Sequence, residues 1–542
     1  MQRLIKRHHL ILILIVGLVC CVLILNQHLM PSGDNSTYLV LAQSLATGQG
    51  YRMISDPRSP QMGLYPPGYP LLLAGVMALT GTTNNPMLAI LPSKAMSILL
   101  YLAAIVVTYK LLLPRSRLLA ALAALLTAVS PAILHFATEV GTEIPYLLLT
   151  LACLWAFDRY LRRPGWRELA LTALFLLLAF YVRSVALAIA GAFALHLAIR
   201  RRYAHAALLV FFVGALTLPW FLRGASLSDT GTSVGLGRGY FDLYLTSDPY
   251  GTAPASLADW SARLFQNLQS YVLDIWPSVL FPHASTLRST LSGLGTVVAL
   301  LLSLLLALGY ALELRRNSPT EWYVGLFFLS CVTYMWAQSR LIVPIVPFAL
   351  YYLLAAARFV LGRLVFRPAP ARPVSDPARP SARGRAVSFA LLLFCAVLIT
   401  SALVVEARRV QDNLQYGMNQ PLAVYYSDNA EWGNYLQAME WVKANAEDQS
   451  IVMCRKADLM YIVTAHRALE YPYSYDGLEL RRSVEDNAVA YLIEDAFTWT
   501  GTTAQYLRPA LQSWQSAEPE ALSLVFETDA PTTRVWRVEK LD

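Results

Sequence analysis

Charged residues are scarce in this sequence. They make up 14% of its 542 residues, whereas 56% of the residues are hydrophobic. A chain with so little charge and so many long apolar runs does not form a soluble globular domain, so the composition excludes a soluble protein. The mean hydropathy of +0.46 agrees with this exclusion. We therefore expect a polytopic α-helical membrane protein.

Three further absences narrow the class of protein. The six cysteines form neither a disulfide framework nor a zinc-binding spacing, because five lie in apolar runs and Cys454 stands alone. The net charge of +8 does not indicate a nucleic-acid partner, since Lys and Arg occur in short clusters between apolar runs. The basic N-terminus lacks the small-residue cleavage site of a signal peptide, so we expect residues 10–25 to remain as a first span.

Eleven apolar runs predict about eleven transmembrane helices. Each run has to be helical because unsatisfied backbone polar groups are costly in hydrocarbon, and a straight span takes about 20 residues. With a cytoplasmic N-terminus, the Lys and Arg clusters all fall on the cytoplasmic side, as the positive-inside rule requires. The predicted spans are residues 10–26, 88–113, 118–135, 143–160, 168–181, 184–199, 204–222, 290–312, 321–336, 341–362 and 387–404.

The polar segments divide the chain into a membrane module, residues 1–404, and a C-terminal domain, residues 405–542. The module has two long outer loops, 27–87 and 223–288, and a cytoplasmic linker, 363–386, whose Pro, Ala and Arg content predicts disorder. The C-terminal domain has the patterns of a small α/β domain and is expected on the non-cytoplasmic side. Its predicted elements are helices at 432–446 and 459–464 and strands at 450–454, 488–493, 522–528 and 533–538.

The first outer loop carries the leading catalytic candidate, Asp34. Apolar residues have helical spacing over 35–46, so we expect a helix that lies along the membrane surface directly after Asp34. Asp34 then either only caps this helix or supplies a catalytic carboxylate. The later segment YPPGYP is either a plain structural turn or a kink whose tyrosines line a sugar-binding wall. Tyr38, Tyr65 and Tyr69 are accordingly candidates for substrate binding.

Ionisable residues also gather between the third and fourth predicted spans. His135, Glu139 and Glu143 are expected on the same side of the membrane as Asp34, and Glu143 begins a span, where an ionisable group is costly. Carboxylates at this rim act as general bases or hold a divalent cation, unless they are simply solvated loop residues.

Three basic residues depart from the cytoplasmic charge pattern. Arg183 and Arg340 lie at the outer ends of apolar spans with no other Lys or Arg beside them. A guanidinium in this position binds an anion such as a lipid phosphate, or it pairs with one of the acidic residues above. Lys94 is a further candidate for the phosphate, unless its side chain snorkels outward.

These motifs resemble those of the GT-C membrane glycosyltransferases. The branch that is most similar holds the dolichyl-phosphate-mannose-protein mannosyltransferases and the bacterial lipid A aminoarabinose transferase. The resemblance covers roughly residues 1–361, and the C-terminal segment is similar to the outer domain of many such bacterial enzymes. The resemblance to the GT-C enzymes depends on the order of five segments along the chain. They are DNSTYLVLAQSLATGQGY, YPPGYPLLLAGVMALTG, TEIPYLLLTLACLWAF, YVRSVAL and SRLIVPIVPF.

The resemblance implies an inverting glycosyltransferase that moves a hexosyl or pentosyl group from a polyprenyl-phosphate carrier at the outer face of a bacterial cytoplasmic membrane. It implies that Asp34 deprotonates an acceptor hydroxyl on a lipid, glycan or protein, and that the leaving phosphate meets Arg183 and Arg340. Asn35 stands where the family often has a second acidic residue, so Glu143 is the candidate for that carboxylate. No cofactor is expected, with a bound divalent cation as the alternative.

Two other classes compete with this reading: a transporter or flippase of lipid-linked sugars, and a non-catalytic scaffold. Transporters commonly have internal repeats and ionisable groups at mid-membrane, whereas this sequence has no internal repeat and its candidate groups lie at the outer rim. The glycines of the second outer loop do not form a phosphate-binding loop, because no strand precedes them. We expect that loop to move over a cleft lined by Trp276 and His283.

Overall fold

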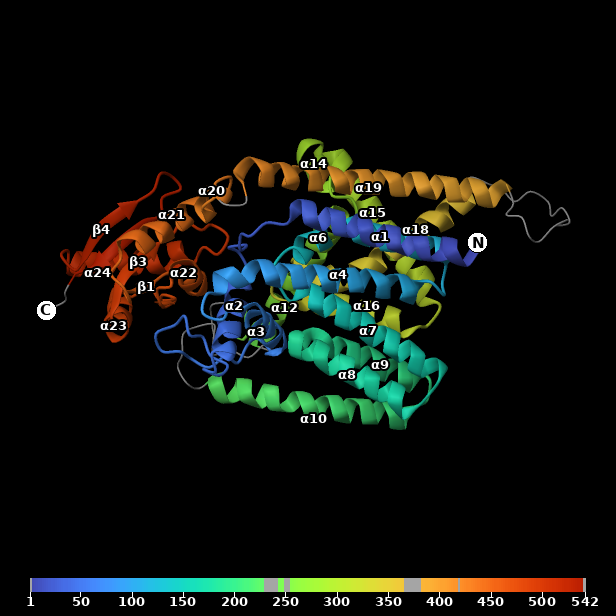
Figure 1. The fold of residues 1–542 in the computed structure, drawn as a ribbon, viewed down its shortest axis with the longest axis horizontal. Coiled ribbons are helices and arrows are strands. Elements are labelled where there is room, and N and C mark those ends of the chain that lie inside the picture. Colours follow the sequence, from blue (N-terminus) through green and yellow to red (C-terminus); the bar gives the residue numbers. More distant parts are fainter. Residues whose placement is uncertain (1, 229–241, 248–253, 365–381, 418–419, 540–542) are drawn as a thin grey trace.

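The computed structural model describes residues 2–228, 242–247, 254–364, 382–417 and 420–539. It consists of a bundle of long helices with a smaller α/β region at one end (Figure 1). The N-terminus lies near the opposite end of the bundle, so the chain starts far from the region in which it finishes.

All eleven predicted spans coincide with helices. The apolar runs thus determine the helical segments, although several are interrupted by a 3-10 turn or a bend. The helices are α1 (Gln2–Ile24), α4 (Ile90–Leu112), α5 (Arg117–Val129) with α6 (Pro131–Ala137), α7 (Glu143–Arg162), α8 (Trp166–Val182), α9 (Leu187–Ile199), α10 (Tyr203–Ser228), α15 (Ser292–Leu314), α16 (Pro319–Thr333), α18 (Val346–Leu364) and α19 (Ala382–Tyr416).

Of the described helices, fewer than the eleven predicted have the length and apolar composition of a complete membrane span. Among the described residues, six helices are long and apolar enough to cross a membrane. A seventh results if α5 and α6, which are bent by 57° relative to each other, form one broken span. These helices define a multi-pass membrane protein, while the total of eleven spans and the side that each end faces stay predictions.

The first outer loop forms two short helices at the end of the bundle next to the α/β region. Helix α2 (Asn35–Ala46) packs against α3 (Gly68–Thr80) and against α22 (Ala457–Thr464) of the C-terminal region. Residues 35–44 are all buried, so protein covers this helix on every face rather than only on its apolar face, while its position along the membrane surface stays a prediction. Its polar side chains contact protein: the Thr37 hydroxyl donates to Asp458 of α22, and the Ser44 hydroxyl donates to the Gly50 carbonyl.

The C-terminal region contains a five-stranded sheet with the strand order β2-β1-β3-β5-β4. Strand β1 (Ile451–Met453) pairs in parallel with β2 (Ala468–Leu469) and with β3 (Val489–Glu494). Strand β5 (Arg534–Val538) pairs antiparallel with β3 and with β4 (Leu522–Glu527). Mixed pairing of this kind requires helical crossovers between the parallel strands, which α22 and α23 (Gly477–Asp486) supply.

The strands and helices predicted for the C-terminal region are confirmed. Helices α21 (Ala430–Asn445) and α22 and the strands β1, β3, β4 and β5 lie at the predicted positions. Strand β2 has only two residues, too few for an alternating pattern, and it was not predicted. Helices α23 and α24 (Arg508–Ala517) were also not predicted.

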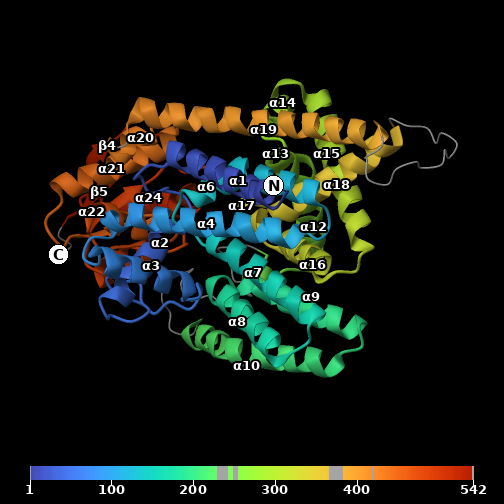
Figure 2. The same cartoon turned by 45° about the vertical axis from the view of Figure 1, so that its right-hand side comes forward.

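Helix α19 joins the bundle to the C-terminal region. It runs along the bundle and leads into α20 (Leu422–Tyr425), as both views show (Figures 1 and 2). The helix continues beyond residue 405, where the C-terminal domain was predicted to begin. The predicted linker falls mainly on residues 365–381, and the glycine-rich part of the second outer loop on 229–241; both lie outside the described residues.

Candidate active site

A cavity of about 900 Å³ lies where the helix bundle meets the C-terminal sheet. Its walls come from α2, the Tyr65 segment, the α6–α7 loop and the start of α17 (Ser339–Ile342) on one side, and from the C-terminal region on the other. The structure brings eight of the ten predicted site residues to this cavity. They are Asp34, Tyr38, Tyr65, His135, Glu139, Glu143, Arg183 and Arg340.

Alternating charges form a chain along one wall of the cavity. Arg340 donates from Nη2 to Asp34 Oδ2 at 2.7 Å and from Nε to Glu143 Oε1 at 3.1 Å. Arg183, which directly follows α8, donates from Nη1 to the same Glu143 oxygen at 3.2 Å. Both arginines are thus paired with carboxylates in this structure, and Glu143 is shared between them.

Asp34 is directed into the cavity by the turn that precedes α2. Gly33 has φ +81°, a backbone conformation that suits glycine, and Arg340 Nη1 lies 3.5 Å from the place where a Cβ of Gly33 would be. Asp34 occupies the N-cap position, but its carboxylate accepts no hydrogen bond from the helix amides. It accepts instead from Arg340 and from the Tyr65 hydroxyl, the latter at 2.9 Å. A capping role alone therefore does not account for Asp34.

The surroundings of Asp34 hold its carboxylate in the ionised form. Burial alone would raise the pKa of Asp34, but the charge and hydrogen bond of Arg340, then Lys456 and Tyr65, lower it below the usual 3.8. Tyr65 remains protonated, because burial and the neighbouring Asp34 charge raise the pKa of its hydroxyl well above 10.0. Asp34 is thus available as a proton acceptor at neutral pH.

Aromatic rings form the wall beside Asp34. Tyr38 lies edge-on to both Tyr65 and Tyr69, with ring centroids 5.4 Å and 5.2 Å apart. Tyr69 is fully buried behind Tyr38 and does not line the cavity. The preceding Gly68 packs against the backbone of Tyr181, where a Cβ would lie 2.5 Å from the carbonyl oxygen. Tyr38 and Tyr65 thus line the cavity, and their role in substrate binding stays a prediction, whereas Tyr69 packs behind Tyr38.

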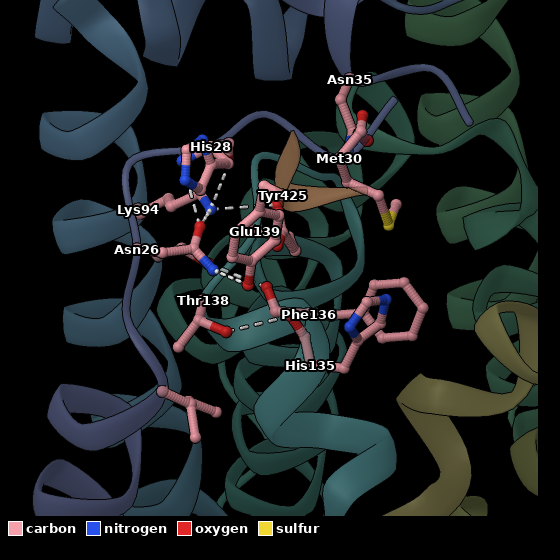
Figure 3. Close-up of polar contacts among 12 residues, drawn as sticks. Asn26, His28, Met30, Asn35, Lys94, His135, Phe136, Thr138, Glu139 and Tyr425 are labelled. Carbon is pink, nitrogen blue, oxygen red and sulfur yellow. Dashed lines mark hydrogen bonds and ion pairs between the residues drawn. The ribbon is translucent and has the colours of Figure 1, made fainter. Parts of the chain in front are cut away.

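Lys94 lies behind the cavity wall in a buried polar cluster (Figure 3). Its ammonium donates to Asn26 Oδ1 at 3.0 Å and to the His28 carbonyl at 2.7 Å, and it pairs with Glu139 Oε2 at 3.3 Å. The ammonium is thus engaged by two hydrogen-bond acceptors and one carboxylate. The side chain is 0% exposed, so it does not snorkel outward. We assign Lys94 to holding Glu139 rather than to the donor phosphate.

The same cluster ties the bundle to the C-terminal region. Asn26 donates from Nδ2 to the Tyr425 hydroxyl at 2.8 Å (Figure 3). That hydroxyl donates to Asn413 Oδ1 at 2.7 Å. Asn26 follows α1, whereas Asn413 belongs to α19 and Tyr425 to α20. Glu139 is the member of this cluster that faces the cavity, and burial raises its pKa more than Lys94 lowers it. His135 lies beside Phe136 on α6 (Figure 3).

Reasoning from the sequence missed the residues that the C-terminal region contributes to the cavity. Lys456 donates from Nζ to the carbonyl of Gly33 at 2.8 Å, so it contacts the residue directly before Asp34. Asp458 accepts a hydrogen bond from the Thr37 hydroxyl on α2. The only sequence signal for them is the short charged stretch that holds Lys456 and Asp458. No spacing rule connects these single polar residues with Asp34, which lies more than 400 positions earlier in the chain.

The expected cleft residues of the second outer loop lie elsewhere. Trp276 is buried and His283 Nδ1 lies 2.8 Å from the hydroxyl of Ser401 on α19, and neither lines the cavity. Within the described ranges, no group of three His, Cys, Asp or Glu side chains is arranged to hold a metal ion.

The architecture is the GT-C fold of membrane glycosyltransferases. ArnT from Cupriavidus metallidurans, solved with bound undecaprenyl phosphate, matches with a TM-score of 0.55 at 13% identity over 97% of both chains. The Archaeoglobus fulgidus oligosaccharyltransferase tethered with an acceptor peptide has a TM-score of 0.57 at 13% identity, over 99% of this chain and 74% of that chain. Arabinofuranosyltransferase AftD from Mycobacteria has a TM-score of 0.50 at 14% identity, over 99% and 40%.

Within this fold class, the chain is similar to the protein mannosyltransferases and to ArnT. Residues 65–222 match the family model described as dolichyl-phosphate-mannose-protein mannosyltransferase. No curated protein matches the chain. The resemblance to the GT-C glycosyltransferases that the motif order indicated is thereby confirmed.

Proposed function

We propose that this chain is an inverting glycosyltransferase that moves a sugar from a polyprenyl-phosphate carrier to an acceptor hydroxyl. The observation that carries the proposal is the ionised Asp34 beside two arginines in one cavity. That the related folds hold undecaprenyl phosphate and an acceptor peptide supports a lipid-linked donor and a separate acceptor.

Asp34 acts as the general base in the proposed reaction. Its carboxylate takes the proton of the acceptor hydroxyl while the hydroxyl oxygen attacks the anomeric carbon of the donor sugar. The bond between the anomeric carbon and the phosphate oxygen breaks, and its electron pair leaves with the polyprenyl phosphate. Attack from the side opposite the phosphate inverts the anomeric configuration.

Arg340 and Arg183 stabilise the departing phosphate. Charge develops on the phosphate oxygens as the bond breaks, and guanidinium groups that contact these oxygens stabilise the charge. The phosphate competes with Asp34 and Glu143 for the N–H groups of Arg340, which are paired with carboxylates in this structure. When Arg340 turns to the phosphate, Asp34 loses its nearest cation and becomes a stronger base, so donor binding also activates the site.

We place this reaction on the non-cytoplasmic side of a cell membrane. Helix α7 supports this placement, because it begins with Glu143 in the cavity and ends with Arg159 and Arg162 in its last turn. Basic residues mark cytoplasmic helix ends, so the cavity lies at the other side of the bilayer. With α7 in this orientation, the eleven predicted spans put the C-terminal domain on the extracytoplasmic side.

The fate of a labelled sugar separates this proposal from a transporter and from a scaffold. Proteoliposomes that contain the purified protein are given radiolabelled hexosyl and pentosyl polyprenyl phosphates together with envelope extract as the acceptor source. The proposal predicts that label moves from the polyprenyl lipid to a second molecule. Label that changes leaflet while still linked to the lipid identifies a flippase, and label that does neither with any carrier identifies a scaffold; both results contradict the proposal.

A further inference from the structure

The C-terminal region supplies a complete wall of the catalytic cavity, opposite the membrane helices. This roof wall consists of residues from the β1–α22 connection and the first turn of α22, from the segment after β2 and from the loop after β3. Its members are Arg455, Lys456, Asp458, Glu470, Tyr473 and Trp499.

Direct bonds fix the roof wall relative to Asp34. The Lys456 ammonium holds the carbonyl of Gly33, and the Asp458 carboxylate holds the Thr37 hydroxyl. A backbone hydrogen bond of 2.8 Å also runs from the amide of Ala468 to the carbonyl of Ser55 in the first outer loop. Because these contacts join the roof wall to Gly33, Thr37 and Ser55 of the first outer loop, a ligand that rests on the roof wall has a defined position relative to the catalytic carboxylate.

The roof wall combines planar hydrogen-bonding groups with aromatic faces. Arg455 pairs from Nη1 with Glu470 Oε1 at 3.1 Å, and the Tyr473 hydroxyl donates to Glu470 Oε2 at 2.9 Å. Arg455 also lies over the Tyr473 ring, with its Cζ 5.9 Å from the centroid. The Glu470 side chain is 35% exposed and Trp499 is 54% exposed, so both can contact a ligand.

The charges of the roof wall cancel. Arg455 is paired with Glu470, and the two remaining charged groups, Lys456 and Asp458, are bonded to the first outer loop. The roof wall holds a single guanidinium, Arg455, whereas the facing wall offers Arg183 and Arg340 to a phosphate. A neutral sugar instead offers vicinal hydroxyls to a paired carboxylate and guanidinium, and an apolar C–H face to an aromatic ring.

We propose that the roof wall is the acceptor subsite and that the acceptor is a neutral sugar with vicinal hydroxyls. Glu470 and Arg455 bind two neighbouring hydroxyls of this sugar, Trp499 packs against its ring, and a further hydroxyl is directed to Asp34. This inference rests on the proposed function and adds to it the chemical class of the acceptor.

Ligand binding by the full chain in lipid nanodiscs tests this inference without requiring turnover. Saturation-transfer NMR measures binding of methyl hexopyranosides, with hexose 6-phosphates and N-acetyl-serine amide as the charged and peptide-like probes. We expect binding of the methyl hexopyranosides, weakened about tenfold by Glu470→Gln and by Trp499→Ala, since each substitution removes about one ligand contact. The exposed-site controls Glu479→Gln and Trp166→Ala leave binding unchanged.

Two results overturn the acceptor assignment. One is that methyl hexopyranosides do not bind, or bind equally well to Glu470→Gln, Trp499→Ala and the wild type. The other is that the phosphorylated or serine probe binds in their place with the same dependence on Glu470. As a control, we expect the Glu470→Gln and Trp499→Ala variants to bind undecaprenyl phosphate as the wild type does. Failure of sugar binding leaves Asp34-dependent transfer intact, so it is distinct from failure of the proposed function.

Discussion

Arg340 donates a hydrogen bond of 2.7 Å to Asp34, a residue 306 positions earlier in the chain. The same guanidinium contacts Glu143, so one side chain joins the first outer loop, the start of α7 and the start of α17. The charge and hydrogen bond of Arg340 explain how the buried Asp34 carboxylate stays ionised. It also means that a ligand that attracts Arg340 changes the basicity of Asp34.

Arg340→Gln is expected to move the acidic limb of the pH profile to higher pH. Arg340 is the main group that lowers the pKa of Asp34, while burial acts in the opposite direction. Asp34 has to be unprotonated to act as a base, so a raised pKa removes activity at a pH at which the wild type still works. The measurement is kcat/KM for sugar transfer as a function of pH. Arg340→Lys keeps the charge and shows a smaller shift; an unshifted limb in Arg340→Gln contradicts the pairing.

Tyr65→Phe is expected to slow transfer by about two- to tenfold, the effect of one lost hydrogen bond. The Tyr65 hydroxyl donates to Asp34 and helps to lower its pKa, so the acidic limb also moves to higher pH. Tyr69→Phe is the matched control, because Tyr69 lies behind Tyr38 and outside the cavity. Equal rates for Tyr65→Phe and the control show that Tyr65 does not act through Asp34.

The sequence predicted the helices and one wall of the site for physical reasons that act locally. Apolar runs have to be helical in a bilayer, and a lone arginine such as Arg183 or Arg340 at the outer end of a span breaks the charge pattern visibly. The roof wall has no such signal, because Lys456 and Glu470 are ordinary polar residues in the segments that follow β1 and β2. Their contact with Gly33 and the cavity arises only when α22 packs on α2.

Two local expectations were changed by tertiary packing. The first is the helix after Asp34, which was expected to be held by its apolar face but is buried on its polar face as well, and α22 packs on it. The second is Lys94, whose chemistry suits a phosphate but whose ammonium is already bonded to Asn26, His28 and Glu139. Burial and partner choice depend on segments distant in sequence, which a single sequence does not reveal.

Lys94→Met is expected to destabilise the protein by about 3–5 kcal/mol, because it leaves Glu139 buried without its cation. The measurement is the thermal unfolding midpoint in detergent, with the exposed Lys110→Met as the control. Adding Glu139→Gln to Lys94→Met recovers part of the loss, since the unpaired charge is then removed. A variant that unfolds at the wild-type temperature but no longer binds undecaprenyl phosphate instead supports a phosphate role for Lys94.

Lys456→Met is expected to lower kcat several-fold while the affinity for undecaprenyl phosphate stays unchanged. Lys456 holds the Gly33 carbonyl and contributes to the lowered pKa of Asp34, so its loss affects the base rather than the phosphate site. Lys456→Arg keeps the charge and restores part of the activity. The control is Lys443→Met on the exposed side of α21. If Lys456→Met weakens only phosphate binding, its assignment to the Asp34 turn is wrong.

The central claim is that Asp34 is the base of an inverting sugar transfer, and a single measurement tests it most directly. Wild type and Asp34→Asn are compared in a single-turnover assay with a labelled sugar on polyprenyl phosphate, and the anomeric configuration of the product is determined by NMR. Loss of a general base predicts a decrease of about 10² to 10⁴ in the rate, with inverted product from the wild type and undiminished binding of undecaprenyl phosphate. Transfer by Asp34→Asn at the wild-type rate, or a product with retained configuration, would contradict the account.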